Sequence, residues 1–535
     1  MRQLKKLIVP VLSLSLVLPT MASAAPAPVK PAAPTVNTPA ADLRAGLDYL
    51  LSEHFVLAVN AMTKAYDGAK DADLAFKALD QNALDMTPAI ASIYGKAGAA
   101  EFERIFREHN NYTDDLVMAT KMKDQAKLDE VADEVEEFVV EFADFLDTAT
   151  EGKLPQEAAE DALRLHEQQV QETFEQYIAG DYKGAYETYR EGFSLMFVIS
   201  KALSSAIVEQ MPEKFGHSKA DTKAADLRST LNSLAAEHVA LTVPQMQKQF
   251  EGAKDYQALI DAEKAHTADF KEAIKSIYGQ AGADQFEKIW VENHIMAQSD
   301  IAIAAMKGDM AARAEVNKRV ESFVKEFGSF LGAATEQNLP AAAAQDAIRT
   351  HENQVAAAFD HYAAGDYEKS YMSFREAYKF VFGIGQALGG AIVTQFSEEF
   401  QEEASPHDMT KIWLKIGSKD LSVDGKVTKM DTAPFIWSGT AFVPLRYLSE
   451  GIGAEVKWDE KTRTIWVMAG EDTLTFWLGK DYMEVNGEKR DIGTKLFARD
   501  GRTAIPLRFI AELLGWDVKW NDAEWSITLT KSMME

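Results

Sequence analysis

Apolar residues recur at helical spacing over most of the chain. From residue 41 to about residue 215 they step by three and four positions, which places their side chains along one face of a helix. The first such stripe consists of Leu43, Leu47, Leu50, Leu57 and Ala61. The pattern is interrupted at Gly68, Gly95, Gly152, Pro155 and Gly180. It predicts a bundle of about six amphipathic helices.

The helical pattern is written twice. Ser92-Ile93-Tyr94-Gly95 returns as Ser276-Ile277-Tyr278-Gly279, and His166-Glu167 returns as His351-Glu352, so the offset changes from 184 to 185 residues. A duplication of this length is evidence about architecture. We therefore expect two tandem all-α bundles, the first over residues 41–215 and the second over residues 225–400.

The pattern changes near residue 405. Apolar residues then alternate with polar ones, as in Lys411-Ile412-Trp413-Leu414-Lys415-Ile416. Within this region, Val443-Pro444-Leu445-Arg446 is matched 62 residues later by Ile505-Pro506-Leu507-Arg508. We expect each unit to form a strand, a short helix that starts at the proline, and a hairpin. The fold class predicted for the chain is therefore multidomain, with two tandem all-α helical bundles followed by a small α+β domain with an internal repeat, at residues 408–530.

Residues 1–24 have the pattern of a secretory signal peptide. Arg2, Lys5 and Lys6 precede an apolar run that is too short to span a bilayer, and Ala22-Ser23-Ala24 fits a cleavage site. Residues 25–40 are rich in Pro and Ala, which predicts an extended spacer. No later stretch is long and uncharged enough to cross a membrane. We therefore expect a secreted protein, extracellular or cell-wall associated, with no transmembrane segment after signal cleavage.

Charge and cysteine content exclude several classes of function. The formal net charge of −27 opposes nucleic-acid binding, which requires clustered Lys and Arg. The absence of cysteine removes disulfides, thiolate metal sites, iron–sulfur clusters and cysteine nucleophiles. The sequence also contains no phosphate-binding loop, dinucleotide fingerprint or serine-nucleophile elbow. We therefore assign no catalytic residue.

Histidines of the helical copies are the candidate metal ligands. They fall within the apolar stripes of three different helices in the first copy and of four in the second. Those of the first copy lie about a dozen residues from each helix start, which places them near mid-height of the bundle. The candidates are His54, His109 and His166 in the first copy and His238, His266, His294 and His351 in the second. Interior histidines at one level are how helix bundles build metal or haem sites, and neutral imidazole suits Zn, Cu, Fe or Ni.

One of these positions is displaced when the copies are aligned. His266 aligns with Asn82, whereas His294 aligns with Asn110 rather than with His109. Further ligands or partners of the histidines are sought among Glu53, Asp85, Glu237 and Asp269. The alternative is that the histidines are ordinary core residues whose ring nitrogens bond carbonyls or carboxylates. No local motif such as H-E-x-x-H is present to decide between the two.

The paired Pro-Leu-Arg segments of the C-terminal region also carry a family resemblance. They stand within Gly439-Thr440-Ala441-Phe442-Val443-Pro444-Leu445-Arg446 and Gly501-Arg502-Thr503-Ala504-Ile505-Pro506-Leu507-Arg508, and a Val485-Asn486-Gly487 turn lies between them. Over about 125 residues, this region resembles the copper amine oxidase N-terminal-like (stalk) domain of secreted proteins of Gram-positive bacteria. The resemblance implies an accessory module and not a catalytic one.

Amine oxidase activity is rejected on the sequence. The catalytic domain of that family needs a tyrosine in a T-x-x-N-Y context and an H-x-H pair of ligands. Here Glu108 occupies the threonine position before Asn111-Tyr112, and H-x-H occurs nowhere.

The function expected from these observations is that of a secreted or cell-envelope-associated, non-catalytic binding or scaffold protein. Its stalk-like domain would associate with the cell wall or with an extracellular protein partner. The first alternative is a metal- or haem-binding helical bundle protein for sequestration or sensing, and the second is a metal-dependent oxidoreductase. The candidate cofactors are a transition metal or haem in the helical bundles, and the sequence does not identify the cofactor further.

Overall fold

The computed structural model describes two compact units, and each is considered by itself. One unit spans residues 33–402, and the other contains residues 403–535. In the second unit the description covers residues 409–532, with gaps at 438–439, 452–453, 470–471, 493–494, 500–501, 508–510, 512–515 and 522–523. The predicted signal peptide at 1–24 and the first half of the spacer, 25–32, lie outside the described residues, as do Gly439, Gly501 and Arg508. The spacer ends earlier than predicted, because α1 begins at Pro39.

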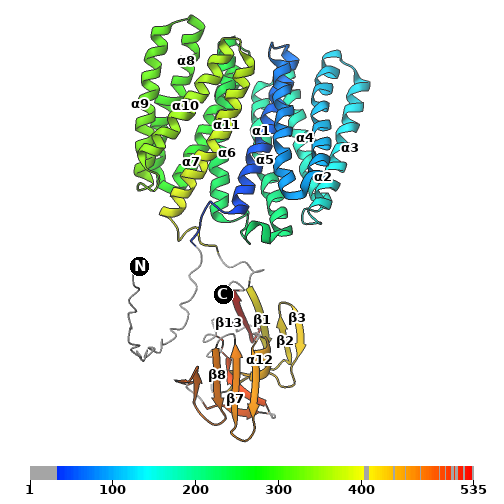
Figure 1. Cartoon of the computed structure of the whole chain (residues 1–535), viewed down its shortest axis with the longest axis vertical. Coiled ribbons are helices and arrows are strands. Elements are labelled where there is room, and N and C mark those ends of the chain that lie inside the picture. The colour runs from blue at the N-terminus through cyan, green and yellow to red at the C-terminus, as the bar shows by residue number, and fades with distance from the viewer. Residues whose placement is uncertain are drawn as a thin grey trace, which may run out of the picture. The chain divides into compact units, whose positions relative to one another are not determined.

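The first bundle is built from five long helices (Figure 1). They are α1 (Pro39–Asp67), α2 (Ala72–Met122), α3 (Gln125–Ala149), α4 (Gln156–Ala179) and α5 (Tyr182–Gln210), followed by the 3-10 turn η1 (Pro212–Phe215). The α2 helix breaks at Gly95, where φ is 75° and ψ is −178°, and so supplies two of the predicted segments. That backbone conformation is one that glycine adopts without strain.

The second bundle repeats the first. Its elements are α6 (Lys223–Glu251), α7 (Tyr256–Trp290), the π-helical turn η2 (Val291–Ile295), α8 (Met296–Lys307), α9 (Met310–Ala334), α10 (Ala341–Ala363) and α11 (Tyr367–Gln395). The break at Gly279 in α7, with φ of 71° and ψ of −179°, matches the break at Gly95. One stretch of continuous helix in the first copy, α2 after its break, therefore corresponds to the end of α7, η2 and α8 in the second.

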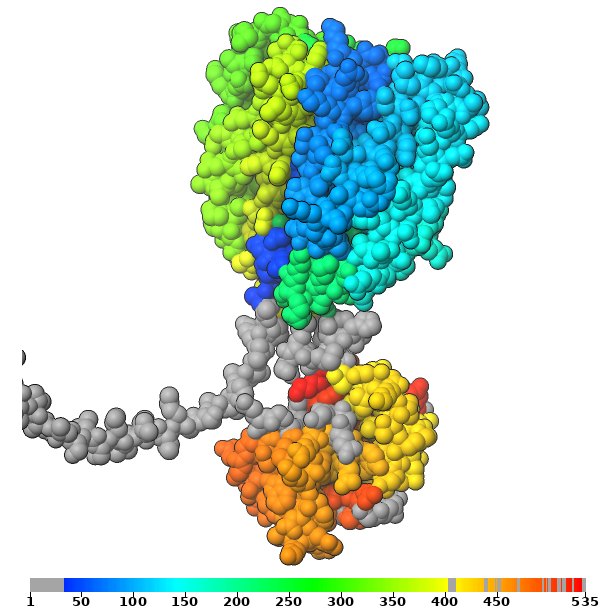
Figure 2. Space-filling view, turned by 45° about the vertical axis from the view of Figure 1, so that its right-hand side comes forward, coloured from blue at the N-terminus to red at the C-terminus, as the bar shows by residue number. Residues whose placement is uncertain are grey.

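The two bundles pack against each other through reciprocal contacts. Arg44 Nη1 lies 2.6 Å from Asp226 Oδ1, and Arg228 Nη1 lies 2.6 Å from Asp42 Oδ1, so each copy gives the other the same ion pair. Figure 2 shows the blue-to-cyan surface of the first bundle running directly against the green-to-yellow surface of the second. Such exchange is characteristic of an isologous interface, here between two halves of one chain.

Helix α5 is the one described helix that is long and apolar enough for a membrane span. Half of that stretch is buried within the helical unit, where Phe193 and Met196 belong to the core. A core helix of a folded unit passes the same test, so its composition is explained by packing between α1 and α4.

The C-terminal unit is rich in short antiparallel strands. They are β1 (Met409–Lys415), β2 (Asp420–Val423), β3 (Lys426–Lys429), β4 (Phe435–Trp437), β5 (Thr440–Pro444), β6 (Glu455–Asp459), β7 (Thr464–Ala469), β8 (Asp472–Trp477), β9 (Tyr482–Val485), β10 (Glu488–Asp491), β11 (Phe497–Arg499), β12 (Arg502–Pro506), β13 (Asp517–Asn521) and β14 (Ser526–Ser532), with one helix, α12 (Leu445–Gly451). They form sheets of order β13-β14-β1-β2-β3, β10-β9-β8-β7-β6 and β11-β12-β5-β4.

The internal repeat of the C-terminal unit is visible in its strand pairing. Strands β5 and β12 are antiparallel neighbours, with Val443 opposite Ile505 and Pro444 opposite Ala504. The two Pro-Leu-Arg segments therefore start from adjacent strands. Leu445 and Leu507 both enter the same apolar core. The predicted fold class, two helical bundles followed by a small domain with strands and a short helix, is confirmed.

Candidate metal centres in the helical bundles

Three histidines meet inside the first bundle. His54 of α1, His109 of α2 and His166 of α4 are 2%, 7% and 5% exposed, and each offers a ring nitrogen within 4.8 Å of the others. Their ring centroids are 5.6, 5.8 and 6.3 Å apart. Three imidazoles around one ion, each about 2.0–2.1 Å from it, would place their ring centres about 5 to 6 Å apart. The predicted histidines are thus already close to the spacing of a ligand set.

A carboxylate completes this cluster. Glu167 Oε1 lies 3.5 Å from His109 Nε2 and 3.8 Å from His166 Nε2. Both ring nitrogens of His54, Nδ1 of His109 and His166, and Oε1 of Glu167 are buried without a hydrogen-bond partner. Buried polar atoms are normally paired, so this concentration of free ligand atoms at one point requires an explanation.

Burial controls the protonation of these groups. It lowers the pKa of His109 to about 3 and that of His166 to about 4, and the neighbouring His166 imidazole adds to the effect at His109. Burial, followed by the repulsion of the other two imidazoles, holds the pKa of His54 well below its usual value. Burial also raises the pKa of the Glu167 carboxyl to about 8. The imidazoles are therefore neutral at neutral pH, which is the form that binds a metal.

A cavity leads to the first cluster. It encloses about 1420 Å³, including its open mouth, and its wall includes the three histidines and Glu167. Exposed Asp129 and Glu175 also line it, so the cavity extends from the buried histidines to the surface. An ion held here would be reachable from solvent.

The second bundle contains an equivalent cluster. His238 of α6, His294 of η2 and His351 of α10 are buried and again offer nitrogens within 4.8 Å of one another. His238 Nε2 and His294 Nε2 are 2.8 Å apart. Glu352 follows His351 as Glu167 follows His166, but its Oε1 lies 2.8 Å from His294 Nδ1, whereas Glu167 faces Nε2 atoms. Both bundles therefore place three imidazoles and one carboxylate at the same level.

The alignment of His294 with Asn110 is wrong, because in the structure His294 occupies the position of His109. The second copy has one extra residue between Trp290 and His294, and the π-helical turn η2 absorbs it. A π-helical turn takes one more residue than an α-helical turn, so His294 returns to the helix face that His109 occupies. Ungapped alignment missed this because the insertion lies within a continuous helix, where no loop marks it.

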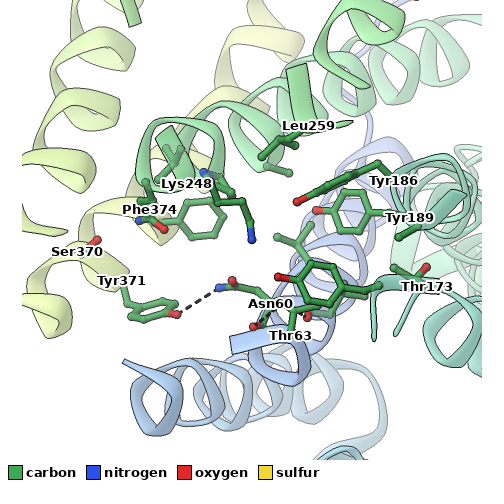
Figure 3. A pocket seen from close by; sticks show the side chains of 18 residues that line it. Asn60, Thr63, Thr173, Tyr186, Tyr189, Lys248, Leu259, Ser370, Tyr371 and Phe374 are labelled. Atoms are coloured by element: carbon green, nitrogen blue, oxygen red, sulfur yellow. Dashed lines mark hydrogen bonds between the residues drawn. The ribbon is translucent and has the colours of Figure 1, made fainter. Parts of the chain in front are cut away.

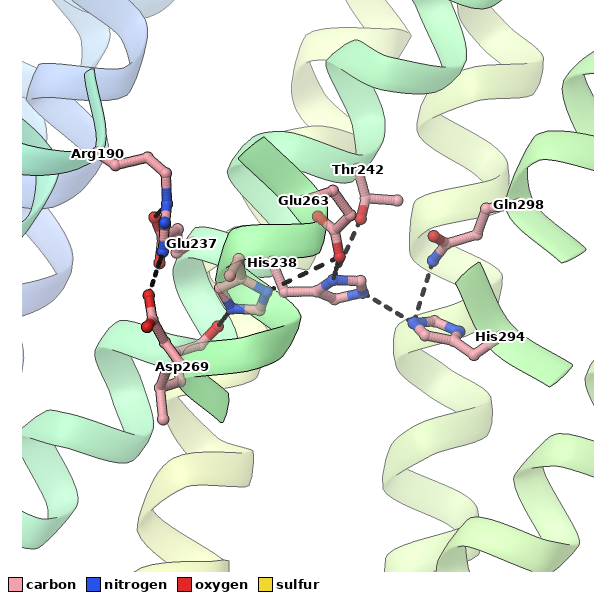
Figure 4. Close-up of polar contacts among 10 residues, drawn as sticks. Arg190, Glu237, His238, Thr242, Glu263, Asp269, His294 and Gln298 are labelled. Atoms are coloured by element: carbon pink, nitrogen blue, oxygen red, sulfur yellow. Dashed lines mark hydrogen bonds and ion pairs between the residues drawn. The ribbon is translucent and has the colours of Figure 1, made fainter. Parts of the chain in front are cut away.

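The polar surroundings of the two clusters differ. The first bundle has Ala58, Leu79, Asn82 and Thr113, whereas the second has Thr242, Glu263, His266 and Gln298. Figure 4 shows His238 between Glu263 and Thr242 on one side and His294 on the other, with Gln298 beyond. His238 Nδ1 lies 3.3 Å from Glu263 Oε1, and Gln298 Nε2 lies 3.2 Å from His294 Nε2. The second cluster is the more polar.

Protonation in the second cluster reflects both burial and its carboxylates. Burial lowers the pKa of His238 to about 4 and that of His351 to about 3, although Glu263 and Glu352 oppose it. Burial alone would raise the pKa of both carboxyls, but contact with the histidines outweighs it and lowers them. The pKa of His266 is raised, because the hydrogen bond and charge of Glu263 exceed the effect of burial.

The acidic residues sought as further ligands are engaged elsewhere. Glu53 and Asp85 pair with Arg375 at 2.7 and 2.8 Å, so they face the other bundle and not the histidines. Equivalently, Glu237 and Asp269 pair with Arg190, each at 2.7 Å (Figure 4). Their role as ligands is therefore not supported by their position. Each of these arginines comes from the opposite bundle to its partners.

The carboxylates that join the histidines are Glu167, Glu263 and Glu352, and sequence reasoning missed them. Glu167 directly follows His166, so on a helix the two side chains point about 100° apart and do not share a stripe. The repeated His-Glu pair at residues 166–167 and 351–352 was the signal that could have identified Glu167 and Glu352. For Glu263 it was the E-x-x-H spacing to His266.

A separate cavity lies where the bundles meet (Figure 3). It encloses about 740 Å³ and is lined by apolar and tyrosine side chains, among them Tyr186 and Tyr371. Asn60 Nδ2 donates to the Tyr371 hydroxyl at 3.2 Å, and Lys248 is paired with Asp255 at 2.6 Å. Since its charged group already has a partner, we assign this cavity to the packing between the copies.

Comparison with known proteins concerns the C-terminal unit. Residues 396–529 match the family model of the copper amine oxidase N-terminal domain, which confirms the resemblance expected from the paired Pro-Leu-Arg segments. No curated protein and no solved structure matches the chain. The family match falls on a domain that is non-catalytic in copper amine oxidases, and it assigns residues 396–529 to the copper amine oxidase N-terminal domain family.

Proposed function

We propose that the helical unit binds divalent transition-metal ions, at least one in each bundle. The ligands are His54, His109, His166 and Glu167 in the first bundle. In the second they are His238, His294, His351 and Glu352. One observation carries the proposal: the second copy gained a residue directly before its histidine, and a π-helical turn restores that histidine to the cluster.

The donor set favours a bare ion over haem. Three imidazoles meet in each bundle and a carboxylate contacts at least one of them, whereas haem iron takes one or two axial ligands from opposite sides of a flat ring. Aromatic side chains also close on the clusters, with Phe138 stacked 4.2 Å from His109 and Phe323 4.6 Å from His294. Imidazole and carboxylate without thiolate suit zinc, copper(II), iron, cobalt or nickel.

We place this metal binding in a secreted or cell-envelope-associated, non-catalytic binding protein that sequesters or senses the ion. The signal-peptide pattern at residues 1–24 supports export. The C-terminal domain would attach the protein to the cell wall or to an extracellular protein partner, as an accessory module. Binding of the isolated C-terminal unit to purified cell walls, compared with the helical unit alone, tests this attachment.

The metal proposal is tested by elemental analysis of the full chain, purified without a histidine tag and without chelator, then loaded with Zn²⁺ and desalted. His166→Ala should remove the ion of the first bundle and His351→Ala that of the second. His361→Ala is the matched control, because His361 lies on α10 with His351 but outside the cluster, bonded to Ser373.

The outcomes are distinct. Loss of bound Zn²⁺ in each ligand variant, with unchanged helical circular dichroism and full loading of the control, supports the proposal. A wild-type chain that cannot be loaded, or equal loading of all variants, would sink it and leave the histidines as core residues.

A further inference from the structure

The second bundle contains a second group of ligand atoms beside its main cluster. Glu263 Oε1 lies 3.3 Å from His238 Nδ1 and 3.8 Å from His266 Nδ1, and the three residues place their ligand atoms within 4.8 Å of one another. All three side chains are at most 3% exposed. This group lies on the Nδ1 side of His238, whereas His294 lies on its Nε2 side.

Hydrogen bonding fixes which atom of His266 faces the group. Its Nε2 lies 2.8 Å from the carbonyl oxygen of Leu234, an acceptor only, so Nε2 carries a proton and donates it. In the neutral ring the Nδ1 lone pair then points toward the Glu263 carboxylate. Neither His266 Nδ1 nor Glu263 Oε2 has a hydrogen-bond partner. Two lone pairs facing each other in a buried site repel, unless a cation lies between them, either a proton shared with Glu263 or a metal ion.

We propose, resting on the metal binding proposed above, that the second bundle holds two transition-metal ions bridged by His238. One ion takes His238 Nε2, His294, His351 and Glu352. The other takes His238 Nδ1, Glu263 and His266 Nδ1. To bridge the ions, His238 loses its ring proton to solvent and binds as imidazolate. The imidazolate and the two carboxylates then offset three of the four positive charges of two divalent ions.

The first bundle is the natural comparison, because it lacks the second group. Leu79 and Asn82 stand where Glu263 and His266 stand, and Asn82 Nδ2 donates to the Leu50 carbonyl at 3.1 Å, as His266 does to that of Leu234. The helix contact is thus retained while the ligand atom is absent. We therefore expect one ion in the first bundle and two in the second.

The chain itself supplies the variant for the test. Glu263→Leu with His266→Asn gives the second bundle the residues of the first, at a place where the fold already accepts them. The full chain and this double variant are loaded with Cu²⁺, freed of loosely held metal on a weakly chelating resin, and analysed for bound copper. The expected result is three ions per chain in the wild type and two in the variant.

Electron paramagnetic resonance gives a second readout. Two copper(II) ions joined by an imidazolate couple antiferromagnetically, so at low temperature the fully loaded wild type should show the signal of about one copper per three bound. In the variant, the signal should account for all the copper. His351→Ala serves as a control that disturbs the main cluster of the second bundle while leaving the ion of the first bundle in place.

The two proposals fail differently. Two ions per chain in the wild type, with full signal and no loss in the double variant, would overturn the bridged pair, since Glu263 would then only accept the His238 Nδ1 proton. That outcome would leave the proposed function standing. No bound copper in any form would overturn the proposed function and this inference together.

Discussion

Burial decides the chemistry of individual side chains in the helical unit. The apolar interior holds His109 and His351 neutral near neutrality, because burial lowers the pKa of each to about 3. A carboxyl without a cationic neighbour responds in the opposite direction, as Glu167 does with a pKa of about 8. The same interior therefore favours the neutral imidazole, which can bind a metal, and disfavours the charged form of an unpaired carboxyl group.

Asp48 shows the cost of an unpaired carboxylate away from the clusters. It is fully buried on α1, and burial raises its pKa to about 6, although Ser200, Ser229 and two nearby arginines offset part of the effect. The equivalent residue of the second copy is Asn232, which is also fully buried and carries no charge. Asp48→Asn should therefore stabilise the protein at pH 7, by up to about 3 kcal/mol for a shift of roughly two pKa units.

The pH dependence of this gain has a definite sign. A carboxyl whose folded pKa is raised contributes its stability below its unfolded pKa of 3.8 and loses it as the pH rises through about 6. The difference in unfolding free energy between variant and wild type should be small at pH 4 and largest above pH 6. Urea denaturation at several pH values measures it. A difference that is constant across this range would contradict the assignment to Asp48.

At the scale of elements, the π-helical turn is the feature that sets the second cluster. Deleting Asn293 leaves Ile289-Trp290-Val291-Glu292-His294. This stretch then has the same number of residues as Ile105 to His109 in the first bundle. We expect the turn to become ordinary α-helix, with the cluster intact and metal loading unchanged. Asn293 contributes only an exposed hydrogen bond to Glu326, so its loss should change stability by less than about 1 kcal/mol.

The matched deletion in the first bundle should behave oppositely. Glu108 is exposed, and removing it takes one residue from continuous α-helix, which rotates His109 by about 100° away from His54 and His166. The ion of the first bundle should be lost, as measured by elemental analysis after Zn²⁺ loading. Equal tolerance of both deletions would show that η2 does not serve the register of His294.

The elements themselves follow from sequence more directly than the clusters do. Stripes of Leu and Ala at helical spacing predict the helices, and breaks such as Gly68 and Gly180 coincide with left-handed caps. The meeting of His54, His109 and His166 was predictable, since each lies in an apolar stripe at mid-height. In the second copy three of the four predicted histidines meet, and His266 lies in a separate group with Glu263. Glu167 was not predictable, because one step along a helix leaves the stripe. The arginine partners of Glu53 and Glu237 were not predictable either. They depend on how the bundles pack, which local periodicity does not encode.

At the scale of the whole helical unit, the two bundles complete each other. Arg375 of the second bundle meets Glu53 of the first, and Arg190 of the first meets Glu237 of the second. Glu53 is fully buried and directly precedes His54, while Glu237 directly precedes His238. Beside each candidate metal centre, the glutamate that precedes the first histidine is therefore held by an arginine from the opposite copy. These ion pairs help to explain why the two copies form one compact unit.

Removing one arginine should reveal this dependence. Arg375→Met leaves the Glu53 carboxylate buried without its cation, although Asn82 still donates to it at 2.8 Å, and an uncompensated buried charge costs about 3–5 kcal/mol. The double variant Glu53→Gln, Arg375→Met should recover part of the loss, because the charge is gone. Denaturant unfolding of the four forms measures the coupling, and metal competition measures the effect on His54. Because Arg375 belongs to the second copy, weaker metal binding in the first bundle alone would demonstrate that the centres are supported across the interface. If the stability losses of the two single variants simply add in the double variant, the Glu53–Arg375 ion pair contributes nothing.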